Sequence, residues 1–184
     1  MYPRKEKEMP KIIENAHDLI ITEAKRQIKE NGYDAVTIRG IAKGCGIGLG
    51  TFYNYFKSKE MLIATFLLED WQQRISNIND FSVSVDDMLI LCEKIHSELM
   101  GFIKSYNDIF TSTSAIRVFN LSMSSYHKML RAQMAEPLQA TAERIGIENS
   151  EFLAQFVAES MIVWTVSGKS FEELSPILIK LFKN

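Results

Sequence analysis

Apolar residues recur every three or four positions along most of the chain, and this spacing limits the possible folds more than any other feature. Between residues 11 and 30, one helical stripe collects Ile12, Ala16, Leu19, Ile20, Ala24 and Ile28. Only four prolines and nine glycines occur in 184 residues, so long helices are possible. The single candidate for a strand is the short run "FSVSV" at residues 81–85. An all-α protein is therefore predicted.

The same spacing divides the chain into segments. After the first helix, further helices are predicted near residues 38–45, 49–56, 58–77, 86–104, 108–119, 122–145, 151–167 and 171–183. Thr37 and Ser58 stand where N-caps are expected, and Pro137 predicts a kink or a break. "NDFSVSVDD" at 79–87 interrupts the pattern. We therefore expect a front domain at 1–57, a connecting helix at 58–78 and a helical back domain at 79–184.

The composition argues against several classes of protein. Cys45 and Cys92 are too few for a disulfide framework or a zinc site. The first residues do not form a signal peptide, and no apolar run approaches a membrane span, so we expect a cytoplasmic protein without a membrane partner. Three scattered histidines give no nucleophile and base arrangement, and the Glu-x-x-His at 93–96 has no second copy. Neither enzymatic activity nor a metal or other cofactor is expected.

Charge differs between the two parts of the chain. Residues 1–65 carry 11 Lys and Arg against 8 Asp and Glu, whereas residues 66–184 carry 10 against 15. A mildly basic front favours a polyanionic partner such as nucleic acid.

Two short predicted helices joined by a glycine turn at 46–48 form a helix-turn-helix pattern. Ile38, Ile41 and Ala42 would pack inward from the first helix, and Phe52 and Phe56 from the second. The outward face of the second helix is then Leu49, Gly50, Thr51, Tyr53, Asn54 and Tyr55. Such a set suits a helix in the DNA major groove. Short aromatic helices also occur as plain core elements, so the spacing alone leaves both interpretations open.

The stretch "YDAVTIRGIAKGCGIGLGTFYNYFKSKEML" at 33–62 resembles the DNA-binding signature of TetR-family (tetracycline-repressor-like) transcriptional regulators. The matching elements are "T-I-R-x-I-A", "G-I" in the turn, "G-T-F-Y-x-Y-F" and "x-S-K-E-x-L". The resemblance implies a three-helix DNA-binding domain in which Lys59 holds a phosphate. The sequence departs from the usual family pattern at Gly44, Gly48 and Leu49. The contacts to DNA that the family pattern implies come from Thr37, Arg39, Gly48, Leu49, Gly50, Thr51, Tyr53, Asn54, Tyr55, Lys57 and Lys59.

The back domain is rich in aromatic residues and Met between residues 102 and 134. A stripe of this kind forms either a core or an adaptable apolar pocket. The TetR resemblance implies an effector pocket in this half for a small apolar or amphipathic molecule. The candidate lining residues are Trp71, Phe102, Tyr106, Tyr126 and Trp164. His96, Arg117 and His127 are candidate polar anchors, or else ordinary residues with partners inside the fold.

The last two predicted helices carry apolar residues at i, i+4 spacing, which indicates an association surface or internal packing. The candidate interface residues are Phe152, Phe156, Ser160, Trp164, Leu174, Leu178 and Leu181. In the TetR family these helices pair across a two-fold axis, and the resemblance implies a homodimer on a near-palindromic double-stranded operator. The expected function is a ligand-released repressor. A transcriptional activator, or a helical protein-docking adaptor without DNA binding, is the alternative.

Overall fold

The computed structural model describes residues 15–84 and 87–182, without the side chains of residues 116–126. The described residues form helices and no strands, which confirms the all-α prediction. The helices are α1 (Ala16–Asn31), α2 (Ile38–Gly44), α3 (Leu49–Tyr55), α4 (Lys59–Val83), α5 (Met88–Ser105), α6 (Asn107–Phe110), α7 (Thr113–Arg144), α8 (Ser150–Val166) and α9 (Phe171–Phe182). The expected arm before Ala16 falls largely on residues 1–14, outside the described residues.

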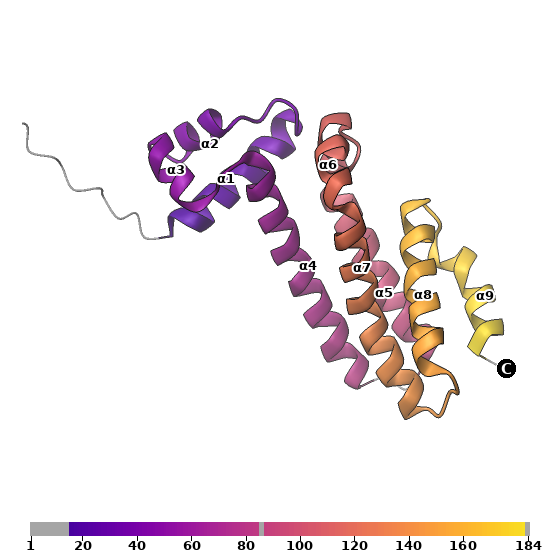
Figure 1. Ribbon diagram of the computed structural model, residues 1–184. Coiled ribbons are helices and arrows are strands. Elements are labelled where there is room, and N and C mark those ends of the chain that lie inside the picture. Colours follow the sequence, from indigo (N-terminus) through magenta and orange to yellow (C-terminus); the bar gives the residue numbers. More distant parts are fainter. Residues whose placement is uncertain (1–14, 85–86, 183–184) are drawn as a thin grey trace, which may run out of the picture.

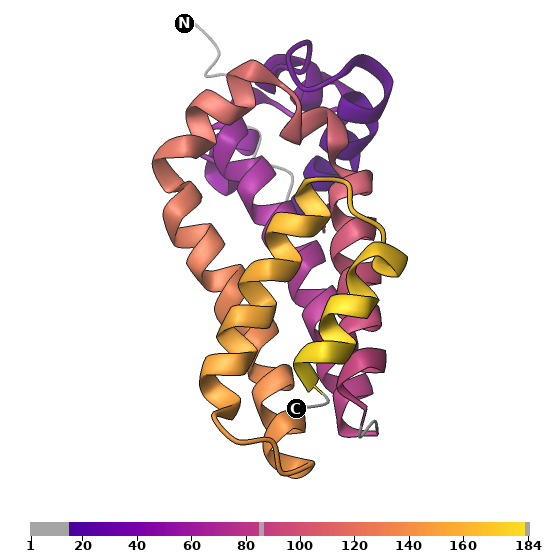
Figure 2. The same cartoon turned by 90° about the vertical axis from the view of Figure 1, so that its right-hand side faces the viewer.

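The helices are arranged as a small unit and a larger bundle (Figure 1). α1, α2 and α3 gather at one end, and α4 leads from them into the bundle. There α4 packs on α5 and α7, while α8 lies along α7 and also contacts α5. α9 packs on α5 at the outside of the bundle (Figure 2). Among the described residues, no helix combines the length and the hydropathy needed to cross a bilayer.

Local sequence signals account for the ends of the front helices. The Thr37 hydroxyl accepts from Gly40 N at 3.1 Å, and the Ser58 hydroxyl accepts from Met61 N at 3.1 Å, so both predicted N-caps are confirmed. α2 ends in a Schellman turn, in which Ile47 N donates to Ala42 O and Gly46 takes a φ of 65°. Glycine adopts this left-handed conformation without a steric penalty. The turn expected at 46–48 is therefore present.

Two predicted helix boundaries are wrong, and the break that was one alternative at Pro137 is absent. α4 continues to Val83 instead of ending near Asn77, and "FSV" at 81–83 is helical because Ile78 and Ser82 continue the buried face of α4. The helix expected at 108–119 is divided, since α6 ends at Phe110 and Ser112 caps a new helix, α7. α7 runs through Pro137 as one curved helix (Figure 2). Its packing on α4, α5 and α8 outweighs the loss of one hydrogen bond at proline.

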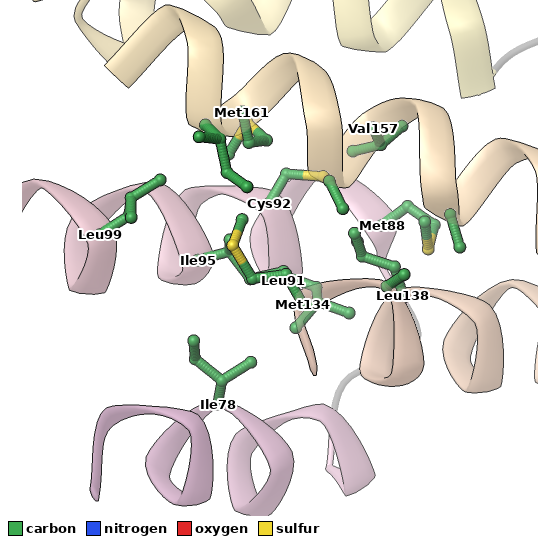
Figure 3. Packing of buried hydrophobic residues seen from close by; sticks show 14 of the residues in the cluster. Ile78, Met88, Leu91, Cys92, Ile95, Leu99, Met134, Leu138, Val157 and Met161 are labelled. Atoms are coloured by element: carbon green, nitrogen blue, oxygen red, sulfur yellow. The ribbon is translucent and has the colours of Figure 1, made fainter. Parts of the chain in front are cut away.

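Two apolar cores hold the molecule together. The larger core lies between α4, α5, α7, α8 and α9, where Ile78, Leu91, Ile95, Met134 and Met161 meet (Figure 3). The smaller core joins α1, α2 and α3 to the first turns of α4, and it also contains two residues from α6 and α7. Each fully buried large side chain of this kind contributes about 1.5–3 kcal/mol. Leu67 and Tyr106 pack against both cores and join them.

Candidate functional site

α3 is fixed from behind by two aromatic side chains. Phe52 and Phe56 are buried, with ring centroids 6.0 Å apart, and both belong to the smaller core. On the other side of α3, Leu49, Tyr53 and Tyr55 are 38%, 44% and 43% exposed. The inward and outward faces predicted for this helix are therefore confirmed. The arrangement places a polar and aromatic surface on a rigid support.

The remaining residues of the predicted DNA surface surround this face. Arg39, Gly48, Gly50 and Asn54 are exposed, and Thr51 is half-buried. Thr37 is exposed but already caps α2. Lys57 follows α3, and its exposed side chain donates to Tyr53 O of that helix at 2.8 Å. All of these residues lie on α2, α3 or the turns beside them. The structure thus brings the set together on one unit.

Lys59 is placed differently from the other candidates. Its ammonium donates to Tyr33 O at 3.0 Å and to Val36 O at 3.1 Å, and it lies 4.1 Å from the centroid of the Tyr33 ring. The Tyr33 side chain is buried, and this burial raises its pKa. In this conformation the Lys59 charge is directed toward the loop between α1 and α2. Sequence reasoning missed this contact, because the partners are more than twenty residues away.

The departure from the family pattern at Gly44 has a structural reason. A side chain at Gly44 would overlap the carboxylate of Glu23 on α1. That carboxylate accepts from Arg26 Nη2 at 2.6 Å and from Gln27 Nε2 at 2.7 Å, and these hydrogen bonds lower the Glu23 pKa to about 2. The space left by Gly44 therefore holds a carboxylate that ties α1 to its own next turn.

Comparisons with known proteins agree with this geometry. Residues 20–65 match the family described as "Bacterial regulatory proteins, tetR family". Over these residues the chain is similar to TetR-family regulators. The HTH-type transcriptional regulator UidR of Escherichia coli K12 is 33% identical over 61 residues, which are 33% of this chain but only 31% of UidR. The fatty acid metabolism regulator protein of Bacillus subtilis is 23% identical over 168 residues, covering 83% of this chain and 85% of that protein.

Solved structures share the fold along the whole chain. A putative TetR-family regulator from Syntrophomonas wolfei matches with a TM-score of 0.62 and 18% identity, covering 91% of this chain and 92% of that one. FadR from Bacillus subtilis, solved in complex with stearoyl-CoA, matches with a TM-score of 0.53 and 19% identity, covering 90% and 96%. The matching family model describes regulatory proteins, and UidR is a transcriptional regulator.

Helices α4 and α5 and the residue after α5 carry a continuous series of aromatic rings. Trp71 contacts Phe102 at 5.3 Å between centroids, Phe102 contacts Tyr106 at 5.3 Å, and Tyr106 contacts Phe66 at 5.7 Å. Trp71 is buried, and its indole N–H donates to Gln133 Oε1 on α7 at 2.9 Å. Burial raises the pKa of Tyr106 to about 12. Three of the predicted lining residues are therefore together, with Trp71 and Phe102 in the larger core and Tyr106 packed against both cores.

The other predicted lining residues are not part of this series. Trp164 borders a groove between α8 and α9, where its neighbours include Ser160 and Leu181. Tyr126 is outside the described side chains, and so is Arg117. His96 is buried and its Nε2 bonds to Lys169 O at 2.9 Å, while the half-buried ring of His127 bonds to Glu159 at 2.9 Å. Both histidines have partners inside the fold.

A polar cluster beside the aromatic series was not predicted. Arg74 on α4 donates to Asp70 Oδ2 at 2.9 Å and to Glu98 Oε2 at 3.1 Å on α5. Gly101 gives the guanidinium room, since a side chain there would meet Arg74 Nη1 at 3.0 Å. The i, i+4 spacing of Asp70 and Arg74 was the available signal. Within residues 15–84 and 87–182, no group of three or more His, Cys, Asp or Glu residues could hold a metal ion.

α8 presents an exposed apolar face. Phe152 is 75% exposed and Phe156 50%, and Val163 and Val166 continue the face along the helix. On α9, Ile177 is exposed, whereas Leu174 and Leu178 are buried in the chain's own larger core. The i, i+4 pattern of these two leucines therefore marks the side of α9 that packs on α5, and it leaves them covered by the chain itself.

Proposed function

We propose that the chain is a ligand-released transcriptional repressor that acts as a homodimer on a near-palindromic operator. The observation that carries the proposal is the exposed face of α3, which a buried pair of phenylalanines holds rigidly. A helix inserted in the major groove needs this combination of a free face and a fixed back.

The proposed contacts divide into two kinds. Tyr53 and Asn54 reach base edges, since Asn can pair with the edge of an adenine, and Leu49 packs on thymine methyl groups. Arg39 and Lys57 bind phosphates, which fixes the register of α3 on the duplex. The other proposed contacts are Thr37, Gly48, Gly50, Thr51 and Tyr55. We exclude Lys59 from direct contact, because its ammonium is already bonded to two backbone carbonyls.

The proposed dimer forms through α8 and the exposed edge of α9. One face of α8 carries four exposed apolar side chains, Phe152, Phe156, Val163 and Val166, and a contiguous exposed apolar patch is typical of an interaction site. This surface extends across the groove between the two helices, which is lined by Ser160, Trp164, Ile177 and Leu181. In the proposed interface Ile177 takes the place of Leu174 and Leu178, because those two leucines are buried in the chain's own core. Two copies joined this way present two α3 helices to the half-sites of one operator.

The proposed effector has a long apolar portion and binds near the aromatic series of Trp71, Phe102 and Tyr106. Trp71 and Phe102 belong to the larger core and contact Tyr106, which packs against both cores. An effector that separated these side chains would change how the front unit sits on the bundle. Stearoyl-CoA is the first compound to test, because it is bound in the FadR structure from Bacillus subtilis that shares this fold. By linkage, a ligand that favours the released state weakens operator binding.

A mobility-shift experiment tests the proposal. The purified chain is titrated against its own upstream DNA at several salt concentrations, with and without stearoyl-CoA. We expect specific binding that weakens with salt, and release when the effector is added. The Tyr53→Ala, Asn54→Ala double variant should fold normally and lose specific binding, whereas Gln72→Ala, exposed on α4, should bind like the parent. A double variant that binds as tightly as the parent contradicts the assignment of α3.

A transcriptional activator is the alternative among regulators, since the dihydroxyacetone kinase operon activator DhaS shares the fold with a TM-score of 0.53. A reporter gene under the bound promoter separates the two roles. Deletion of the regulator raises expression if it represses and lowers expression if it activates. A chain that binds no DNA under any salt condition would support the protein-docking adaptor.

A further inference from the structure

Asp34 connects the front unit to the first turn of α7. It lies in the loop between α1 and α2, and its carboxylate accepts from Ser112 Oγ at 3.2 Å and from Ser114 Oγ. The two serine hydroxyls are 3.1 Å apart. These contacts join residues 78 and 80 positions apart in the sequence. One carboxylate thus bridges the DNA-binding end of the chain and the helix that runs the length of the bundle.

The position of Asp34 at the start of α7 strengthens this contact. Ser112 is the N-cap of α7, and its hydroxyl accepts from Ala115 N at 3.2 Å while it donates to Asp34. A carboxylate at a helix N-terminus is favoured by the free N–H groups and the helix dipole. On its other side, the loop that carries Asp34 is bonded to Lys59 of α4 through Tyr33 O and Val36 O. The loop is therefore held from both α4 and α7.

Apolar packing places the same junction inside the front core. Ile109 of α6 and Ala115 of α7 are buried in the smaller core together with residues of α1, α2 and α3. Farther along α7, Gln133 accepts from the Trp71 indole in the aromatic series. Helix α7 thus touches the front unit with its first turn and the aromatic series with its middle. A displacement of α7 at one of these places is carried to the other, since a helix moves as a stiff element.

We propose that Asp34 is a positioning residue that sets the orientation of the helix-turn-helix unit by binding the first turn of α7. This inference rests on the proposed function and adds a second connection to the covalent one through α4. When the Asp34 contacts hold, the unit follows α7, so the two α3 helices of a dimer keep a fixed spacing. Without the contacts, the unit keeps its internal structure and loses its fixed orientation.

The test compares a complete operator with half of it. Asp34→Ala and Ser114→Ala should each lower the affinity for the complete operator by about 2- to 30-fold, the range typical of residues that couple two sites. Their affinity for a duplex with a single half-site should equal that of the parent, because a half-site requires no spacing between two units. Ser114→Thr, which keeps a hydroxyl, should bind the complete operator with the affinity of the parent. Asp80→Ala, an exposed carboxylate on α4, is the matched control and should change neither affinity.

An equal loss on the half-site and the complete operator would overturn the proposal, because Asp34 would then act within the helix-turn-helix unit itself. Hydrogen exchange on the full chain gives a reading that needs no DNA. In Asp34→Ala, the amides of residues 107–115 and those of 33–44 should exchange severalfold faster together. Faster exchange confined to 112–115 would indicate a local cap and would also overturn the proposal. If the parent bound no DNA, the regulator proposal would fail and the exchange result would still decide the role of Asp34.

Discussion

Replacing Lys59 with Met tests whether this side chain serves the fold or contacts DNA. The change keeps an unbranched apolar side chain and removes the ammonium, which lies 4.1 Å from the centroid of the Tyr33 ring. Two hydrogen bonds, to Tyr33 O and Val36 O, are lost along with the cation–π contact. The structure therefore predicts a loss of stability with little direct effect on phosphate binding.

The magnitude follows from these three contacts. Hydrogen bonds from a charged donor contribute about 1.5–3 kcal/mol each when buried, and half-buried Lys59 retains about 1 kcal/mol for each. A cation–π contact at a partly exposed site adds about 0.5–1 kcal/mol. We expect the free energy of unfolding to fall by about 2–3 kcal/mol. For a chain of this size, the unfolding temperature should fall by about 5–10 °C.

Thermal unfolding followed by circular dichroism measures the stability, and operator affinity at several salt concentrations measures the phosphate contacts. Lys57→Met is the control, since the exposed Lys57 ammonium bonds only within α3 and its turn. Lys57→Met should keep the unfolding temperature and reduce the slope of log affinity against log salt by about 0.9 per subunit. Lys59→Met should lower the unfolding temperature and leave the salt slope unchanged. An unchanged unfolding temperature for Lys59→Met, together with a reduced salt slope, would refute the reasoning.

Three further predictions concern the surface, the turn and the charge pairs. Phe156→Glu should weaken dimerisation by about 2 kcal/mol or more, because a charged side chain replaces an apolar one in the proposed interface. Sedimentation velocity measures the dimer affinity, and a dimer as tight as the parent's refutes the α8 interface. Gly46→Ala should lower the free energy of unfolding, measured by urea titration, by about 1–2 kcal/mol, because φ is 65° there. Gly46→Asn should lower this free energy by less. Glu23→Gln should cost about 0.5–1 kcal/mol at pH 7. Since the folded-state pKa of Glu23 is about 2 against an ordinary 4.5, this difference should disappear as the pH of the urea titration falls from 4.5 to 2.

The front unit could be predicted from sequence because its signals are local. Thr37 and Ser58 bond to backbone N–H groups three residues away, and Phe52 and Phe56 are one helical turn apart. Each of these relations is contained in a few consecutive residues, so the helical period and cap preferences suffice to find them.

The features that sequence reasoning missed depend on partners far along the chain. Lys59 reaches a loop 23 to 26 residues earlier, and Asp34 meets Ser114 across 80 residues. Leu174 is covered by the chain's own bundle, and no pattern within α9 distinguishes that from a second copy. Pro137 predicted a kink or a break, and packing of α7 on three neighbours keeps the helix continuous through this residue. In each case tertiary contacts decide between locally equal alternatives.

The core around Phe52 has a consequence for the construction of hybrid regulators. This core is completed by Ile109 and Ala115, which come from beyond the connecting helix. A hybrid cut at residue 78 and joined to the back half of a relative would lose both residues and receive whatever side chains the relative places there. The packed front unit is therefore discontinuous in sequence, and it consists of α1 through the first turns of α4 together with residues 106–115.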